Sequence, residues 1–157
     1  MIKISKLADY AVVVLAALAT SDTRQMTASG LSSQTGLPEP TVAKVLKLLT
    51  RDNILESLRG VNGGYRLTMA PADLSIARVV VAVDGPVMVT SCVEGSGDTC
   101  SYQTHCAVKG RWNRVNDAVR SALEGITLRD MMQSAPSAES VDTRERLHDR
   151  YIEGVAV

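Results

Sequence analysis

Three cysteines, Cys92, Cys100 and Cys106, lie within one glycine-containing segment and occur nowhere else in the chain. Their spacing, Cys-x7-Cys-x5-Cys, is wider than that of the closely paired cysteines in structural zinc sites. Thiolates spread along a pliable segment suit an iron–sulfur cluster, because its separate iron atoms each need a ligand. A zinc site and a thiol-based redox switch stay open as alternatives, since composition does not distinguish them.

The odd number of thiols leaves one position of a four-iron cluster without a sulfur ligand. Candidates close in sequence are Glu94, Asp98 and His105. His105 is adjacent to Cys106, so it is sterically awkward for both side chains to reach one cluster. A carboxylate is a hard ligand that holds iron more weakly than a thiolate does. It would therefore make the cluster easier to displace or oxidise, which suits a sensor.

The composition limits the kinds of protein to which the chain can belong. Hydrophobic residues make up 45% of 157 residues, with no Phe and one Trp, which predicts an aliphatic core. The apolar run 11–19 is too short to span a membrane and is interpreted as a helix rather than a signal peptide. Two histidines and no catalytic signature around Ser or Cys argue against an enzyme. Unpaired thiols indicate a reducing, cytoplasmic compartment.

The formal net charge is zero, but the charges are unevenly distributed. Residues 1–70 contain 8 Lys/Arg and 5 Asp/Glu, a net of +3, whereas residues 71–157 contain 9 and 12, a net of −3. A mildly basic first half fits contact with DNA at one end of the molecule.

The first half also has the pattern of a helix-turn-helix. Ser5 can cap a helix over 6–19, and residues 21–25 are predicted to form a polar turn. Thr27 can cap a short helix over 28–35 that Gly36 ends. A third helix is predicted over 39–52, with Pro40 tolerated in its first turn. A short helix, a glycine-containing turn and a longer helix are typical of this DNA-binding motif.

The third predicted helix has one apolar and one cationic face. Its apolar stripe consists of Val42, Val45, Leu46 and Leu49. The opposite face carries Pro40, Lys44, Lys47 and Arg51, with Thr41 at its edge. A cationic face directed away from the core suits a helix in the major groove. The alternative is an ordinary amphipathic helix with a solvated face.

A β-hairpin is predicted directly after this helix. Residues 54–58 and 65–68 are predicted strands, joined by the glycine-rich turn 59–64. A hairpin in this position is typical of a wing, and Arg59 at its base can enter a narrow minor groove. A plain surface hairpin is the alternative.

The second half predicts further helices. Residues 75–83 are predicted to be helical, although their β-branched residues leave a strand as an alternative. From 107 to 124, apolar residues repeat with heptad spacing, which predicts a helix that pairs with its copy in a second subunit. Packing only against its own domain is the alternative. The members of this seam are Val108, Trp112, Val115, Val119 and Ala122. Thr127 can cap a short helix that follows and runs through Met132.

The predicted fold class is mainly α with a small β-hairpin: a winged helix-turn-helix plus a long C-terminal dimerisation helix. The predicted units are 1–84 for DNA binding, 85–106 for the cysteine segment, 107–133 for dimerisation and 134–157 for a flexible tail.

Several segments together resemble the Rrf-two family of bacterial winged-helix regulators. They are the opening MIKISKLADYAVVVLAALA, the turn LRGVNGGYRL, the segment SIARVVVAVDG, the three cysteines and the closing ITLRDMM. The resemblance covers about residues 1–133 and implies a cytoplasmic homodimer that binds double-stranded operator DNA. It also implies an iron–sulfur cluster that controls this binding. The opening and closing segments look closest to regulators of SUF-type cluster assembly operons, and a nitric-oxide or redox-sensing repressor of the same family is the alternative.

The resemblance also implies the site residues. The DNA contacts of the family fall here on Pro40, Thr41, Lys44, Lys47, Arg59, Asn62 and Gly63. IscR-type members carry a histidine where this chain has Lys109, which disfavours a histidine-ligated two-iron cluster. NsrR-type members place an aspartate ligand in the first helix, where this chain has Asp9. The resemblance thus favours a four-iron cluster held by Cys92, Cys100, Cys106 and Asp9, the last from the other subunit. The alternative role of Asp9 is stabilisation of its own helix N-terminus.

Overall fold

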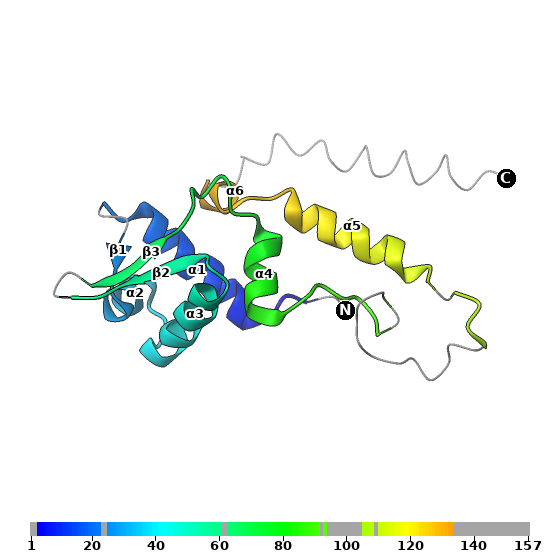
Figure 1. Ribbon diagram of the computed structural model, residues 1–157, viewed down its shortest axis with the longest axis horizontal. Coiled ribbons are helices and arrows are strands. Elements are labelled where there is room, and N and C mark those ends of the chain that lie inside the picture. Colours follow the sequence, from blue (N-terminus) through cyan, green and yellow to red (C-terminus); the bar gives the residue numbers. More distant parts are fainter. Residues whose placement is uncertain are drawn as a thin grey trace.

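The computed structural model describes residues 3–22, 25–60, 63–91, 93, 105–108 and 110–133. In chain order the elements are α1 (Lys6–Thr20), β1 (Gln25–Met26), α2 (Ala28–Thr35), α3 (Glu39–Arg51), β2 (Leu55–Leu58), β3 (Gly64–Leu67), α4 (Ile76–Asp84), α5 (Trp112–Glu124) and α6 (Leu128–Met132). Figure 1 shows the first three helices and the sheet gathered at one end, α4 beside them and α5 extending away. The predicted mainly α fold with a small β component is confirmed.

Local capping sets the helix boundaries. The Ser5 and Thr27 hydroxyls accept hydrogen bonds from the backbone N–H groups of Ala8 and Gly30, which begins α1 and α2. Gly36 adopts φ 72°, a left-handed conformation that ends α2 and turns the chain toward α3. The three predicted caps are thus confirmed. They could be predicted because each depends on residues no more than three positions away.

An aliphatic core joins α1, α2, α3 and α4. Its fully buried members include Leu15, Leu18, Leu31, Leu46 and Leu49. Burial of each of these side chains contributes about 1.5–3 kcal/mol. The chain contains no Phe, and leucine and valine side chains fill its core instead, as the composition predicts.

The sheet has one strand more than the sequence predicts. The hairpin of β2 and β3 is confirmed, with Glu56 opposite Arg66 and Ser57 opposite Tyr65. In addition, β1 pairs antiparallel with β3, giving the order β1-β3-β2. The sequence placed residues 21–25 in a polar turn. A two-residue strand has no periodicity to detect, and β1 forms only because the fold brings it beside β3.

The pairing of β1 requires a glycine at position 64. Gly64 has φ 156°, and a Cβ added there would lie 2.7 Å from the Met26 carbonyl oxygen. We expect Gly64→Ala to lower the free energy of unfolding by about 1–3 kcal/mol, because β1 must move away. Urea titration of the variant measures this loss. In the control Gly125→Ala, the added Cβ lies at an ordinary 3.4 Å, and a loss as large as that of Gly64→Ala would contradict the explanation.

The helical alternative for residues 75–83 is the correct one. Ser75 caps α4 by accepting a hydrogen bond from the Arg78 backbone N–H. The start of α4 is also tied to the start of α6, because Ile76 donates to the Ile126 carbonyl and Leu128 donates to the Leu74 carbonyl, both at 2.8 Å. These bonds therefore attach the start of α6 to the start of α4 after the chain has passed through α5.

A capping box begins α6, as the predicted cap at Thr127 requires. Hydrogen bonds from the Thr127 hydroxyl, and then from its backbone N–H, lower the pKa of the Asp130 carboxyl. Because the folded-state pKa is lowered, this contact stabilises the fold at neutral pH. Its contribution is lost as the pH falls through that pKa.

The predicted start of the long helix at residue 107 is wrong, because α5 begins at Trp112. Gly110 has φ 73°, and Arg111 and Asn113 donate to the carbonyls of Val108 and Gly110 in turns. Val108 thus precedes the helix, and the heptad seam within α5 starts at Trp112. None of the helices in the described part of the chain is long and apolar enough to cross a membrane.

Candidate nucleic-acid interface and cysteine segment

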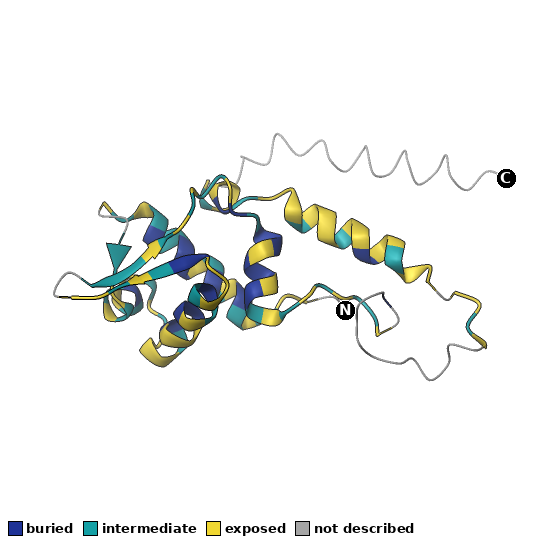
Figure 2. Cartoon of the chain, viewed as in Figure 1, coloured by how far each residue is buried: buried dark blue, intermediate teal, exposed yellow. Residues whose placement is uncertain are grey.

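Helix α3 buries its apolar stripe and leaves its basic residues outside. Val42, Val45, Leu46 and Leu49 are buried against the core, as the wheel predicts. Pro40, Lys44 and Lys47 are exposed, and Thr41 is half-buried. The colouring in Figure 2 separates the two faces of α3. The structure therefore brings these four predicted site residues together on one helix.

The hairpin of β2 and β3 supplies a second exposed element beside α3. Arg59 is exposed, Gly63 is half-buried and Asn62 lies outside the described residues. The Gly63 N–H donates to the Gly60 carbonyl at 2.9 Å. A Cβ on Gly63 would lie 2.7 Å from the Leu58 carbonyl oxygen, so the turn accepts no side chain there.

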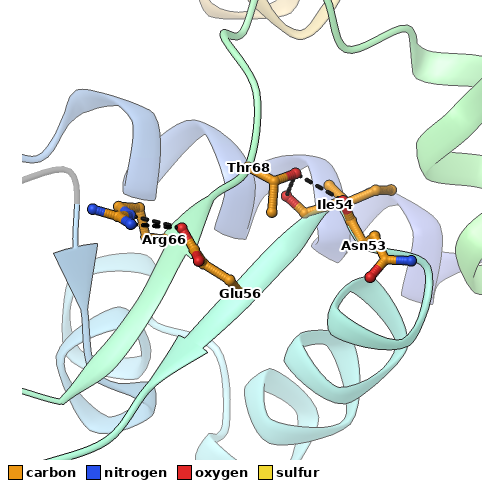
Figure 3. Close-up of polar contacts among 5 residues, drawn as sticks. All are labelled: Asn53, Ile54, Glu56, Arg66 and Thr68. Carbon is orange, nitrogen blue, oxygen red and sulfur yellow. Dashed lines mark hydrogen bonds and ion pairs between the residues drawn. The ribbon is translucent and has the colours of Figure 1, made fainter.

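Polar contacts fix the base of the hairpin against α3 (Figure 3). The Thr68 hydroxyl donates to the Asn53 carbonyl at 2.7 Å, at the turn that follows α3. The Arg66 guanidinium pairs across the strands with the Glu56 carboxylate at 2.8 Å. The hairpin therefore leaves the end of α3 in a defined direction, as a wing does.

Three exposed cations lie at this surface, and within the described ranges no ion pair involves Lys44, Lys47 or Arg59. Their charge is thus available to DNA phosphates, whose contacts dominate the salt-dependent part of DNA affinity.

Arg51, predicted to share the cationic face, is exposed, and its side chain also reaches α4. One guanidinium nitrogen, Nη2, lies 3.2 Å from the Ala82 carbonyl oxygen and 3.2 Å from the Asp52 carboxylate. Ala82 is in the last turn of α4, where carbonyl groups lack helical partners and a cation is favourable. Arg51 therefore holds the end of α3 against α4. Sequence spacing could not reveal this contact, because the two residues are 31 positions apart.

We expect Arg51→Ala to weaken operator binding by roughly 3- to 10-fold through loss of this bond. The slope of log affinity against log salt concentration should stay as in the parent protein, because no phosphate contact is removed. Lys44→Ala is the comparison and should lower that slope by about one. Fluorescence anisotropy at several salt concentrations measures both. A lowered slope for Arg51→Ala would place Arg51 on the DNA instead.

Asp9 and Cys106 are the described members of the predicted ligand set. Asp9 is exposed in the first turn of α1, and Cys106 is a free, half-buried thiol. Cys92 and Cys100 lie outside the described residues. The part of the chain that the structure describes contains no group of three or more His, Cys, Asp or Glu side chains able to hold a metal ion.

The ends of α1 and α4 are joined near Asp9. The Ser5 hydroxyl, which caps α1, also donates to the Asp84 carboxylate at 2.6 Å. Asp84 is the last residue of α4, and Gly85, with φ 87°, then directs the chain toward the cysteine segment. The helix that carries Asp9 and the start of the cysteine segment therefore share one junction.

The start of the cysteine segment is also held by a residue of α5 that the sequence analysis missed. The Asn116 side chain of α5 is buried, and its Oδ1 accepts a hydrogen bond from the Val89 backbone N–H at 3.1 Å. A polar residue among the apolar positions of an amphipathic helix was the available signal, but the sequence gives no hint of the partner.

A family model described as Rrf2, an iron-dependent transcriptional regulator, matches residues 4–134. The chain belongs to the Rrf2 family. IscR of Vibrio cholerae is 32% identical over 118 residues, which cover 75% of this chain and 66% of IscR. An HTH-type transcriptional regulator of Mycobacterium tuberculosis is 31% identical over 134 residues, covering 85% of this chain and 83% of that one.

Solved structures support the same Rrf2 assignment. CymR of Bacillus subtilis, described as the global cysteine regulator, superimposes with a TM-score of 0.63 at 25% identity. The match covers 84% of this chain and 97% of CymR. As an Rrf2 protein with a winged helix, the chain is a DNA-binding transcriptional regulator and not an enzyme.

Proposed function

We propose that the protein is a homodimeric regulator whose operator affinity is controlled by an iron–sulfur cluster. The cluster would be of the four-iron type, held by Cys92, Cys100 and Cys106 of one chain and Asp9 of the partner subunit. One observation carries the proposal. All three cysteines of a chain whose family is described as iron-dependent lie in the segment that joins α4 to α5.

The donor chemistry of the residues fits such a cluster. Thiolates are soft ligands that suit iron–sulfur clusters, and Cys106 is present as a free thiol rather than a disulfide. The Asp9 carboxylate is exposed and forms no ion pair within the described ranges, so it is available to a second chain.

A dimer through α5 is supported by its exposed apolar residues. The side chains of Trp112 and Val115 are 40% and 43% exposed, and Ile126 just beyond the helix is 42% exposed. They continue the heptad seam, and burying them against a second copy removes apolar surface from water. In such a dimer two copies of α3 present their exposed faces to two operator half-sites.

The proposed mechanism uses contacts within the chain to link the cysteine segment to α3. When bound, the cluster supplies iron–thiolate bonds that oxidation or nitric oxide can break. Gly85 links the cysteine segment to the end of α4, and Val89 ties the segment to Asn116 of α5. Arg51 in turn connects the last turn of α4 to α3. A change in the cysteine segment would therefore bias the spacing of the two recognition helices, and so the operator affinity.

The test is anaerobic purification followed by visible spectroscopy and assays for iron, sulfide and zinc. A brown protein with near-equal iron and sulfide is expected. Its operator affinity should change when the cluster is removed by a chelator. Colourless, iron-free protein that binds the same operator equally well would overturn the proposal. Zinc in place of iron would support a zinc-stabilised regulator, and neither metal would support thiol-based control.

The fourth ligand is tested by Asp9→Ala. Loss of the carboxylate should leave three thiolates and accelerate cluster loss in air several-fold, because one iron becomes open to oxidants. The decay of visible absorbance measures the rate. Asp73→Ala removes another exposed acid, from a site distant in sequence, and should have no effect. An unchanged decay for Asp9→Ala would remove this residue from the ligand set.

The target genes are proposed to be those for iron–sulfur cluster assembly, because the opening and closing segments of the chain resemble regulators of SUF-type assembly operons. Sequencing of genomic fragments bound by the purified protein identifies the operators. Enrichment of assembly operons supports this target. Enrichment of nitric-oxide detoxification genes, with binding abolished by nitric oxide, would instead favour a nitric-oxide-sensing repressor.

A further inference from the structure

Asn116 is the single polar side chain among the buried residues that the structure describes. It lies on the face of α5 that packs toward α4, with only 5% of its surface exposed. A buried amide in an apolar contact is unfavourable unless it is hydrogen-bonded, whereas leucine of similar size would pack there without that cost. The bond from the Val89 N–H to Asn116 Oδ1, at 3.1 Å, is therefore the feature that distinguishes this position.

Val89 belongs to a short stretch that runs from α4 to the cysteines. Two residues earlier, Val87 packs against the small apolar cluster of Ala8, Ile76 and Val80, together with Leu123 of α5. The stretch is thus held by an apolar contact at Val87 and by a polar contact at Val89. Val93 then donates to the Thr90 carbonyl in a turn and is itself buried.

The same helix also holds the other end of the cysteine segment. Cys106 precedes α5 by a few residues that form two hydrogen-bonded turns. The bond between Val89 and Asn116, which are 27 positions apart, therefore closes a loop that contains all three cysteines. Cys92 follows Val89 by three residues, so it can lie no more than about 11 Å from this anchor.

We propose that Asn116 is a positioning residue that closes the cysteine loop and limits the separation of Cys92 from Cys106. The link of this closure to an iron–sulfur cluster rests on the proposed function, but the closure itself does not need a metal. Closing a loop raises the effective concentration of groups near its two ends.

The test compares Asn116→Leu, which keeps the size and removes the acceptor, with Asn116→Asp, which keeps an acceptor oxygen. The first measurement is amide hydrogen exchange at Val89 in the full-length protein. Exchange should be about tenfold or more faster in Asn116→Leu and close to the parent rate in Asn116→Asp. Asp117→Leu, an exposed polar-to-leucine change on the same helix, should leave it unchanged. Unchanged exchange at Val89 in Asn116→Leu would overturn the proposal.

A second measurement reports on the cysteines without metal. In metal-free protein carrying Cys100→Ser, Cys92 and Cys106 are equilibrated with a glutathione redox buffer. The equilibrium constant for their disulfide should fall several-fold when Asn116→Leu is added. An unchanged constant would show that the bond does not position the thiols and would overturn the proposal.

The two proposals fail in different ways. If the parent protein holds no iron but Asn116→Leu still lowers the disulfide constant, the cluster is excluded and loop closure is supported. If the parent protein holds a cluster, Asn116→Leu should shorten its lifetime in air several-fold. A lifetime equal to that of the parent would overturn the role of Asn116 while leaving the cluster in place.

Discussion

Replacing Lys44 and Lys47 together with alanine is expected to weaken operator binding by roughly 10- to 100-fold at moderate salt. Both side chains are exposed on one face of α3, and neither forms an ion pair within the described ranges. Each lysine on a phosphate releases about one counterion when it binds, so the salt slope should fall by about two. Fluorescence anisotropy across a salt series measures the affinity and the slope together.

The matched control for this pair removes the same charge elsewhere. Lys3 and Lys6 are exposed at the start of α1, whose cap Ser5 contacts the end of α4 rather than the wing. Their double alanine variant should keep most of the affinity and the slope. An equal loss in both double variants would mean that net charge, and not the α3 face, governs binding. Unchanged affinity in the Lys44 and Lys47 variant would remove α3 from the DNA interface.

Cys106→Ser is expected to abolish nearly all iron binding. Serine keeps the shape of the side chain but replaces a thiolate with a hydroxyl, which is a poor ligand for iron in such clusters. Loss of this ligand leaves two cysteines, fewer than a stable cluster needs. Iron content and visible absorbance after anaerobic purification measure the effect.

The thermal stability of the metal-free protein is the control for Cys106→Ser. Cys106 is half-buried and is not part of the apolar core clusters, so the thermal midpoint of the metal-free protein should stay within a few degrees of the parent. Iron content equal to the parent in a well-folded variant would contradict the ligand assignment. A large loss of stability in the metal-free state would point to a packing role for Cys106.

Contacts around α4 connect α3 with the cysteine segment. Arg51 joins α3 to the last turn of α4, Ser5 joins α1 to Asp84, and Asn116 joins α5 to Val89 just beyond α4. Helix α3 and the cysteine segment are therefore attached to the same end of one helix. A change of local structure there is positioned to affect both, which is the physical basis of the link that we propose between the cysteine segment and operator affinity.

Features that depend on residues close together in the sequence were predictable from it. The caps at Ser5, Thr27 and Thr127 depend on side chains that bond to backbone a few positions ahead. The apolar stripe of α3 follows from helical periodicity, which spaces buried residues by three or four positions. The cysteine spacing and the basic face of α3 likewise stand in the sequence itself, so the class of regulator could be proposed before the fold was known.

One boundary error shows the limit of periodicity. The apolar repeat continued back to Val108, yet α5 starts at Trp112 because Gly110 takes a positive φ and the preceding residues form turns. The glycine at 110 was a visible warning, since such a residue often stands outside a helix. Periodicity reports which face is apolar but not where the backbone first becomes helical.

The tertiary structure alone decided the contacts between distant residues. The pairing of β1 with β3, the turn of Arg51 toward Ala82 and the bond between Asn116 and Val89 each join positions 27 or more apart. Such contacts depend on how the helices pack, because a side chain selects its partner from whatever the folded chain brings within reach. The sequence therefore determined the elements and their chemistry, whereas packing determined which distant residues contact one another, at Arg51 and Ala82 and at Asn116 and Val89.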